Sequence, residues 1–258
     1  MSAPYHLDGG AANGHWRSLQ DTVVVVTGAG GGIGGAAARL VLEVGGKVVA
    51  GDLRAESLAL LREEWGEDRL ATVTGDSRLE STADALVAAG VDAFGRVDSV
   101  IANAAIGFYG GLLDYSSDEV ELMVDLNVKG TVWLARAAVR QFREQGDGGD
   151  IVIIGSVAGL MIGGGQEAVY AATKGAQINL GTALDRELRS EGIRTTVIAP
   201  AGVNTAFAAA DGRFGDKDPS EGHFMEATDI AEAIVYTLRQ PRRMRTELWT
   251  MWSLAENH

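Results

Sequence analysis

Short apolar runs alternate with longer amphipathic segments along most of the chain. The first run, TVVVV at residues 22–26, is β-branched at every position, which is typical of a strand buried on both faces of a sheet. Segments such as AESLALLREEWG at residues 55–66 have a helical pattern instead. Because this alternation continues without a linker or a break in composition, it predicts one α/β domain: a doubly wound, Rossmann-type parallel sheet with helices on both faces.

The predicted domain covers residues 21–258. A length of 258 residues suits one large α/β domain or two small ones, and the unbroken alternation favours one. Residues 1–20 are polar and rich in glycine, alanine and asparagine, so we expect a flexible N-terminal tail there. No apolar run approaches the ~18 residues of a membrane span, and the first residues do not resemble a signal peptide. The sequence therefore predicts a soluble, cytoplasmic protein.

Charge and composition exclude several classes of function. The formal net charge is −13, which argues against nucleic acid or an anionic membrane as the main partner. The chain has no cysteine, so a disulfide framework, a thiolate zinc site and a cysteine nucleophile are excluded. Its four histidines are scattered without metal-ligand spacing. We predict no metal site and a small molecule as the partner.

A glycine-rich turn, TGAGGGIGG at residues 27–35, joins the first predicted strand to the first predicted helix. Glycines at such a turn let the backbone approach a pyrophosphate and direct the amides of the helix toward it. The glycines satisfy several registers of the dinucleotide-binding motif at once. The alternative is a glycine-rich turn that binds no ligand. The strand before it and the helix after it favour a dinucleotide. The candidate residues are Gly28, Gly31, Gly32, Ile33 and Gly34.

Acidic residues end the second and third predicted strands. Asp52 lies 24 residues after Gly28, where a carboxylate binds the hydroxyl groups of the adenosine ribose and repels a 2′-phosphate. We therefore expect NAD rather than NADP, with Leu53 also at the ribose. Asp76 and Ser77 are candidates for binding the adenine amino group. The alternative for either aspartate is a cap of the following helix.

Tyr170 and Lys174 are four residues apart in AVYAATKGAQ. In a helix their side chains leave the same face about one turn apart. A phenol ionises near pH ~10, and a fixed cation beside it lowers that pKa. A shift of three units requires roughly 4 kcal/mol, which would make the phenol a general acid and base at neutral pH. The alternative is a surface pair, or a half-buried tyrosine covered by the lysine side chain.

Six segments, in order and at similar spacing, resemble the single-domain short-chain dehydrogenase/reductase family between about residues 21 and 250. Any one of them alone is unspecific, but six together are specific. The segments are TGAGGGIG (27–34), ANAA (102–105), LNVKG (126–130), IIGSVAG (153–159), YAATK (170–174) and PAGVNT (200–205). Two positions depart from the family pattern, because Ala105 and Ala201 stand where the family usually has glycine. A methyl group there narrows the space near the nicotinamide and removes no functional group.

The resemblance implies a role for each matched residue. Tyr170 would be the general acid and base, and Lys174 would lower its pKa and bind the nicotinamide ribose. Ser156 would hydrogen-bond the substrate oxygen, and Asn127 would hold a water that links Lys174 to solvent. The other cofactor-binding positions implied are Asn103, which would also steady the central strands, Ala104, Pro200, and Val203 and Thr205 at the carboxamide.

The sequence thus predicts an NAD-dependent oxidoreductase that acts on a secondary alcohol or its ketone. Two alternatives remain open: a catalytically idle NAD-binding sensor, and a sugar-nucleotide epimerase or dehydratase of the longer related family. The set of Asn127, Ser156, Tyr170 and Lys174 argues against a sensor. The lack of an additional substrate domain argues against the longer family. The resemblance also implies a homodimer or homotetramer built on the long helices near Asn127 and after Lys174.

We expect the substrate pocket to be lined by residues that follow the motifs, and a lid at about residues 205–225. The lid sequence contains Phe207, Phe214 and Phe224 among many charges, and Gly163 to Gly165 leave the floor open. The expected lining residues are Ile106, Phe108, Tyr109, Leu160, Met161 and Ile162. They favour an uncharged, partly apolar alcohol, although sugars, steroids, acyl thioesters and small diols stay open.

Overall fold

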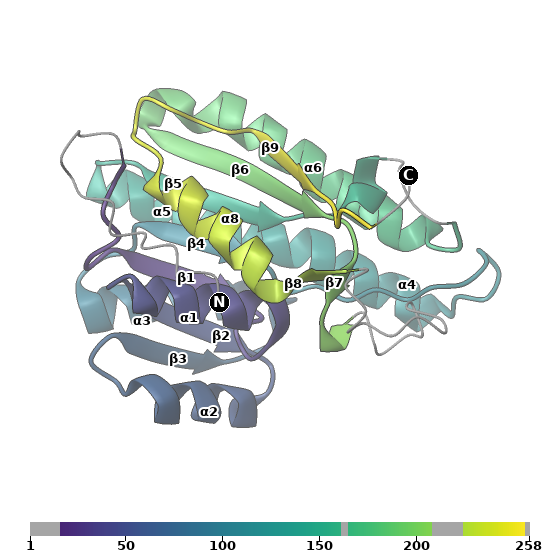
Figure 1. Ribbon diagram of the computed structural model, residues 1–258, viewed down its shortest axis with the longest axis horizontal. Helices are drawn as coiled ribbons and strands as arrows, with labels where there is room; N and C mark the ends of the chain where they lie inside the picture. The colour runs from purple at the N-terminus through teal and green to yellow at the C-terminus, as the bar shows by residue number, and fades with distance from the viewer. Residues whose placement is uncertain (1–15, 161–164, 208–223, 256–258) are drawn as a thin grey trace.

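A computed structural model describes residues 16–160, 165–207 and 224–255 of the chain. Its centre is a parallel sheet of seven strands in the order β3-β2-β1-β4-β5-β6-β9 (Figure 1). The strands are β1 (Val23–Thr27), β2 (Lys47–Asp52), β3 (Leu70–Thr74), β4 (Ser99–Ala102), β5 (Gly149–Ile154), β6 (Ile193–Pro200) and β9 (Leu248–Met251). The order reverses between β1 and β4, so the predicted doubly wound sheet is confirmed.

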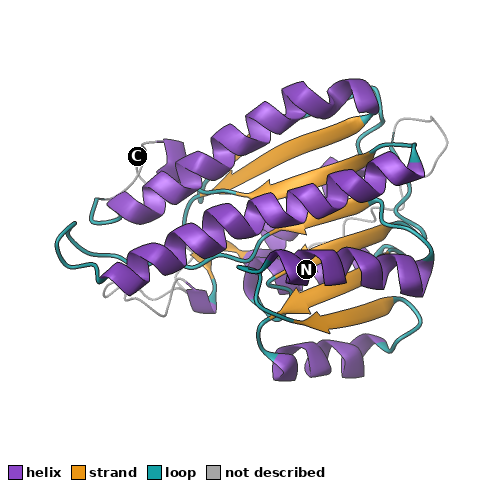
Figure 2. Cartoon of the chain, turned by 180° about the vertical axis from the view of Figure 1, so that it is seen from behind, coloured by secondary structure: helices purple, strands orange, loops and turns teal. Residues whose placement is uncertain are grey.

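Helices cover both faces of the sheet. On one face lie α1 (Gly32–Glu43), α2 (Ala55–Trp65) and α8 (Ala227–Arg239), with α1 and α8 in front in Figure 1. On the other face lie α3 (Glu80–Phe94), α5 (Thr131–Gln145) and α6 (Ala168–Leu188), which Figure 2 shows from behind. Within the described ranges, no helix is both long and apolar enough to cross a membrane.

The apolar strands are buried because helices pack on both sides of them. Every residue of β1, β5 and β6 is buried, whereas the edge strand β9 alternates between exposed and half-buried residues. Central strands that are apolar along their whole length are what a doubly covered parallel sheet requires. A small pair of strands, β7 (Val203–Asn204) and β8 (Met225–Glu226), lies beyond the end of β6.

Residues 117–145 form one continuous helix with an irregular middle. It begins as α4 (Ser117–Met123), widens to a π-helix at Val124–Gly130, and continues as α5. A capping box starts it, because Ser116 accepts from the Glu119 amide and the Glu119 side chain accepts from the Ser116 amide. Single π turns are frequent at functional sites, and this one contains Asn127.

Residues 16–20, which we expected to belong to a flexible tail, pack on the folded domain. The Trp16 ring lies 4.7 Å from the Tyr236 ring of α8, centroid to centroid, and Leu19 is only 2% exposed. These contacts join residues that are more than 200 positions apart, so local composition could not reveal them. Residues 1–15 of the expected tail lie outside the described residues.

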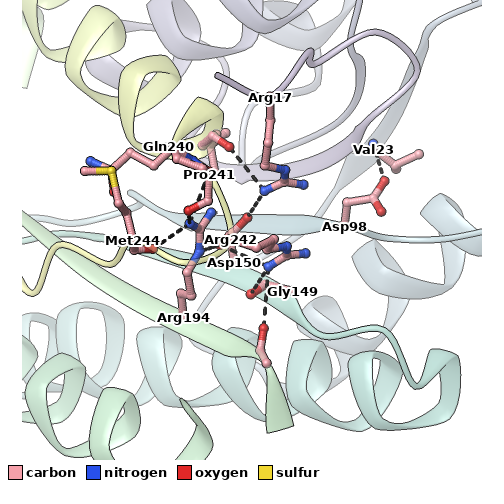
Figure 3. Close-up of polar contacts among 12 residues, drawn as sticks. Arg17, Val23, Asp98, Gly149, Asp150, Arg194, Gln240, Pro241, Arg242 and Met244 are labelled. Carbon is pink, nitrogen blue, oxygen red and sulfur yellow. Dashed lines mark hydrogen bonds and ion pairs between the residues drawn. The ribbon is translucent and has the colours of Figure 1, made fainter. Parts of the chain in front are cut away.

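Asp150 anchors a cluster of arginines at the amino end of β5 (Figure 3). Its carboxylate, in a residue only 4% exposed, lies 2.9 Å from Arg17, 2.6 Å from Arg194 and 3.5 Å from Arg242. Arg194 also donates to the carbonyl oxygen of Met244 at 2.8 Å. The cluster thus joins four segments at the amino ends of the strands: the N-terminal segment, β5, β6 and the chain after α8.

Candidate active site

A cavity of about 510 Å³ lies at the carboxyl ends of the strands. Its lining includes residues that end or directly follow strands from both halves of the sheet, among them Gly28, Asp52, Asn103, Ser156 and Pro200. In an open parallel sheet the crevice beyond the carboxyl ends is where ligands bind, at the point where the strand order reverses. The volume is within the usual range for small-molecule pockets.

Nearly all residues that the sequence singled out line this one cavity. They are Gly28, Gly31, Gly32, Ile33, Asp52, Leu53, Asp76, Ser77, Asn103, Ala104, Ser156, Tyr170, Lys174, Pro200, Val203 and Thr205. Gly34 and Asn127 do not line it. The lining residues that sequence reasoning missed include Arg78, Leu122 and Leu126. The two leucines are four apart on one helix, which was an available signal, whereas nothing in the sequence marked Arg78.

The glycine turn has the conformation and the close contacts that exclude side chains. Gly28 has a φ of +66°, which favours glycine. A Cβ atom on Gly34 would lie 2.3 Å from the carbonyl oxygen of Gly28, so helix α1 packs closely on the turn. The amino end of α1 has no acidic residue in its first turn and no side-chain cap. A free helix N-terminus of this kind suits the pyrophosphate of a dinucleotide.

Asp52 is held at the end of β2 by two backbone amides. Its carboxylate accepts a hydrogen bond from the Gly30 amide at 2.9 Å and another from the Arg54 amide at 3.0 Å. The side chain is 10% exposed and lines the cavity. The bond to Arg54 lies next to the start of α2, so a local capping role and a ligand-binding role can coexist. The fixed carboxylate can accept further hydrogen bonds from a ligand in the cavity.

Asp76 forms an ion pair with Arg78 at the same end of the cavity. The Arg78 guanidinium donates to the carboxylate at 2.8 Å through Nε and at 2.6 Å through Nη2. This side-chain hydrogen bonding lowers the pKa of Asp76 below its ordinary value, against the opposing effect of partial burial. Asp76 therefore remains a carboxylate, and Arg78 adds a cation to the rim that the sequence had not predicted.

Ser156, Tyr170 and Lys174 meet where β5 ends against α6. All three are buried, with exposures of 4%, 4% and 2%. The Lys174 Nζ donates to the carbonyl oxygen of Ile154 at 2.9 Å and lies 5.7 Å from the centroid of the Tyr170 ring. The Ser156 Oγ accepts from the Ala158 amide at 3.2 Å. A hydroxyl, a phenol and an ammonium thus share one wall of the cavity.

Asn127 lies behind the cavity wall, where its side chain serves the protein framework. Its Oδ1 accepts from the Ile106 amide at 2.8 Å, and its Nδ2 donates to the Ile106 carbonyl at 2.8 Å and to the Thr173 Oγ1 at 3.0 Å. The residue is fully buried. Its side-chain amide therefore joins the loop after β4 to α6, three residues from Tyr170. The water-holding role that the resemblance implies stays a prediction.

Asn103 connects the two strands on either side of the reversal in strand order. Its Nδ2 donates to the Thr27 carbonyl at 2.9 Å and to the Gly28 carbonyl at 3.3 Å. In return, the Thr27 Oγ1 accepts from the amides of Asn103 and Ala104 at 3.1 and 3.2 Å. These four bonds hold the end of β4 against the glycine turn after β1, beside the cavity.

The other end of the cavity is apolar. Ile106, Ala206 and Phe207 line it near Tyr170, and Phe108 and Tyr109 pack in the same cluster. Of the other residues expected here, Leu160 packs against the core, whereas Met161, Ile162 and Phe214 lie outside the described residues. The expected lid at 205–225 is described only at its two ends. Within the described ranges, no group of three acidic or histidine residues is placed to hold a metal.

Comparison with known proteins places this architecture in one family. The family model described as short chain dehydrogenase matches residues 22–214. An uncharacterised oxidoreductase of Staphylococcus aureus (strain USA300) is 35% identical over 226 residues, which cover 88% of this chain and 94% of that protein. A relative from Staphylococcus haemolyticus, also an uncharacterised oxidoreductase, is 33% identical over 223 residues, which cover 86% of this chain and 93% of that protein.

Solved structures agree with the match. The 3-ketoacyl-(acyl-carrier-protein) reductase from Brucella melitensis, complexed with NADH, has a TM-score of 0.83 and 28% identity, covering 91% of this chain and 97% of that chain. A serine dehydrogenase complexed with NADP+ has a TM-score of 0.84 and 26% identity, covering 92% and 97%. The family model, the sequence identity and the shared architecture together show that this chain is an oxidoreductase of the short-chain dehydrogenase family.

Proposed function

We propose that this cavity binds NAD and that the protein transfers a hydride between the cofactor and a secondary alcohol or ketone. The observation that carries the proposal is the shared cavity wall: buried Ser156, Tyr170 and Lys174 line the same space as the glycine turn and Asp52. A nucleotide held at the turn would therefore extend toward the phenol. A dinucleotide sensor without activity has no need of this buried set of polar side chains.

The described residues fit a nicotinamide dinucleotide along the length of the cavity. A bound nicotinamide ring would supply the hydride donor or acceptor. The helix α1 N-terminus would bind its pyrophosphate, and Asp52 would bind the adenosine ribose through the carboxylate that Gly30 and Arg54 orient. The other assigned positions are Leu53 at that ribose, Asp76 and Ser77 at the adenine, Lys174 at the nicotinamide ribose, and Pro200, Val203 and Thr205 at the carboxamide.

Tyr170 is proposed to move the proton. In the oxidative direction its phenolate accepts the hydroxyl proton of the substrate, and in the reductive direction its phenol returns a proton to the carbonyl oxygen. Lys174, held by the Ile154 carbonyl, places a positive charge near the ring and favours the phenolate. The Ser156 hydroxyl donates a hydrogen bond to the substrate oxygen as negative charge develops on it. Asn127 acts by holding the loop after β4.

The preference for NAD over NADP rests on Asp52. The relatives of known structure include one complex with NADH and one with NADP+, so membership of the family leaves the cofactor open. A 2′-phosphate beside the Asp52 carboxylate would make a like-charge contact in a largely buried place. Arg54 is the nearest compensating cation, and its side chain is 65% exposed, with its Nε 3.5 Å from Asp52.

Two measurements test the proposal. A panel of secondary alcohols and ketones, followed by the absorbance of the reduced nicotinamide, should reveal turnover of at least some members. Tight NAD binding without turnover of any alcohol or ketone would support a sensor and contradict the proposed activity. Values of kcat/KM measured with both cofactors should favour NAD, and an equal or greater value with NADP would show that Asp52 does not govern the ribose site.

A further inference from the structure

A series of hydrogen bonds between buried polar groups runs from the middle of α6 to its first turn. The Gln177 Nε2 donates to the Thr131 Oγ1 at 2.8 Å, and the Thr131 Oγ1 donates to the Asn127 carbonyl oxygen at 2.7 Å. The Asn127 Nδ2 donates to the Thr173 Oγ1 at 3.0 Å, and the Thr173 Oγ1 donates to the Tyr170 carbonyl oxygen at 2.8 Å. We call Gln177, Thr131, Asn127 and Thr173 the Gln177 network. It leaves α6, passes through the π turn and returns to α6 at the proposed catalytic residue.

The Gln177 network is shielded from water along its whole length. The exposed fractions are 1% for Gln177, 3% for Thr131, 0% for Asn127 and 3% for Thr173. Hydrogen bonds are stronger in such a low-dielectric place than in water, and consecutive bonds polarise one another. The network therefore ties α6 to the π turn before α5, and both helices cover the same face of the sheet (Figure 2).

Gln177 decides which way the Thr131 hydroxyl points. A hydroxyl has one hydrogen to donate and lone pairs that accept. Because the Gln177 side-chain amide donates to the Thr131 oxygen, the Thr131 hydrogen is directed at the Asn127 carbonyl. A threonine that bonds the carbonyl four residues before it often bends a helix, and Thr131 does so where the π turn meets α5. Gln177 thus acts on the shape of the π turn from the neighbouring helix.

The oxygen of the same Gln177 amide has no hydrogen-bond partner among the residues that the structure describes. This Oε1 is buried as well. A buried acceptor without a partner is unfavourable, and a leucine, which has a similar volume, would avoid that penalty. Stability alone therefore gives little reason for a glutamine at position 177, whereas a need for the Nε2 donor does.

Asn127 extends the network to two walls of the apolar end of the cavity. Its side chain accepts from the Ile106 amide and donates to the Ile106 carbonyl, each at 2.8 Å, and Ile106 lines the cavity. Through Thr173 the same side chain is joined to the backbone of Tyr170, which lines the cavity from α6. A shift of the π turn would therefore move Ile106 and Tyr170 relative to each other.

We propose that Gln177 is a positioning residue for the reaction. Through Thr131 and Asn127 it holds the first turn of α6, so that the Tyr170 phenol keeps its place beside Lys174 at the cavity wall. The inference rests on the proposed function and adds to it a buried residue that does not line the cavity. Its effect on rate can be large, because a misplacement of ~1 Å in an active site can slow a reaction by about 100-fold.

Gln177→Leu removes the donor together with the unpaired acceptor and keeps the volume. We expect the single-turnover rate with cyclohexanol, or with whichever alcohol of the panel is oxidised fastest, to fall about three- to tenfold. The dissociation constant of NADH and the urea midpoint should stay close to those of the wild type. Gln240→Leu is the matched control, because Gln240 is 2% exposed and its Nε2 donates to the Thr246 Oγ1 at 2.9 Å. Lower stability with unchanged turnover in Gln177→Leu would overturn the proposal.

Variants of Thr131 test whether Gln177 acts through that hydroxyl, and they also provide the answer if Gln177→Leu fails to fold. Thr131→Val should lower the single-turnover rate at least as much, and Thr131→Ser, which keeps the hydroxyl, should restore most of it. The double variant Gln177→Leu/Thr131→Val should be within about twofold of Thr131→Val, and losses that multiply would contradict a shared route. Thr237→Val is the control, because Thr237 is a buried threonine of α8 that bonds the Ala233 carbonyl.

The ionisation of Tyr170 measures the positioning without turnover. Tyrosinate absorbance is titrated with pH in each protein with and without Tyr170→Phe, and the difference isolates this phenol. A looser phenol gains less from the Lys174 charge, so its titration should move to higher pH in Gln177→Leu, as should the acid limb of alcohol oxidation. Two ionisable side chains near the ring stay the same in all variants: Lys174, with its Nζ 5.7 Å from the centroid, and Tyr109, with its ring 5.5 Å away.

The proposed function and the positioning role fail separately. If the wild type turns over no alcohol or ketone although NAD binds, the proposed function is wrong, and the positioning role falls with it. If the wild type is active and Tyr170→Phe is not, the proposed function stands. An unchanged single-turnover rate and an unchanged Tyr170 titration in Gln177→Leu would then refute the positioning role alone.

Discussion

Lys174 follows Tyr170 by about one turn of α6, and its Nζ lies 5.7 Å from the centroid of the phenol ring while it donates to the Ile154 carbonyl at 2.9 Å. The hydrogen bond to the end of β5 therefore fixes the position of the lysine ammonium group. Both residues are buried, so the charge acts on the phenol with little screening by water. This relationship bears directly on the Tyr170→Phe variant.

Tyr170→Phe should lower kcat by about 100-fold or more and leave the affinity for NAD nearly unchanged. The substitution removes the proton donor and keeps the ring that packs between Tyr109 and Phe207. The checks are steady-state kinetics and a fluorescence titration with reduced cofactor. Tyr236→Phe, at a half-exposed tyrosine on α8, is the matched control. Turnover by Tyr170→Phe within a few-fold of the wild type would rule out the proposed acid and base.

Asp52→Ala should narrow the advantage of NAD over NADP, mainly by weakening NAD. The variant would lack the carboxylate that is proposed to bind the ribose and to repel a 2′-phosphate. The Gly30 amide would also lose its partner, so part of the effect reflects a looser glycine turn. Dissociation constants for both reduced cofactors measure the change, with the exposed Asp68→Ala as the control. An unaltered ratio would show that another residue sets the preference.

Arg78→Gln should make NAD binding weaken at a higher pH than in the wild type. Hydrogen bonds from Arg78 lower the pKa of Asp76, so the wild-type carboxylate stays ionised until the pH falls below the ordinary range of an aspartate. A carboxylate with a lowered pKa keeps its charge at pH values where an ordinary aspartate becomes protonated. The proposed contribution of Asp76 to NAD binding is therefore lost only as the pH falls through that lowered pKa. Titrations of NAD between about pH 6 and pH 4 should show the curves separating at the acidic end, and coincident curves would remove Asp76 from the cofactor site.

Asp150→Asn should destabilise the fold by about 3 kcal/mol, because it leaves Arg17, Arg194 and Arg242 near one another without the buried anion. Burial already lowers the pKa of Arg242, while attraction to Asp150 opposes that shift. Urea unfolding at pH 7 provides the measurement. Asp147→Asn, at an ion pair whose aspartate is 53% exposed, should cost much less. Since the cluster lies away from the cavity, NAD affinity at low denaturant should persist.

Local pattern was sufficient to predict the elements and the residues that gather at the carboxyl ends of the strands. The β-branched run before the glycine turn and the acidic ends of β2 and β3 are features of consecutive residues, and parallel strands bring their carboxyl ends to one edge. Asn127 shows the limit of that reasoning. The resemblance placed it near the site, and only the folded structure shows that its side chain bonds to Ile106 and Thr173 behind the wall.

By itself, the sequence determined the doubly wound sheet, the turn at Gly28 and the Tyr170–Lys174 pair, since each depends on periodicity or on neighbours within one or two turns of chain. Tertiary structure alone decided three things: that residues 16–20 join the domain, that Arg78 pairs with Asp76, and that Gly107 lies against Tyr109, Tyr170 and Phe207. The first and third depend on packing between segments far apart in the chain. The second depends on the side-chain directions of two residues in the turn after β3, which residue order does not specify.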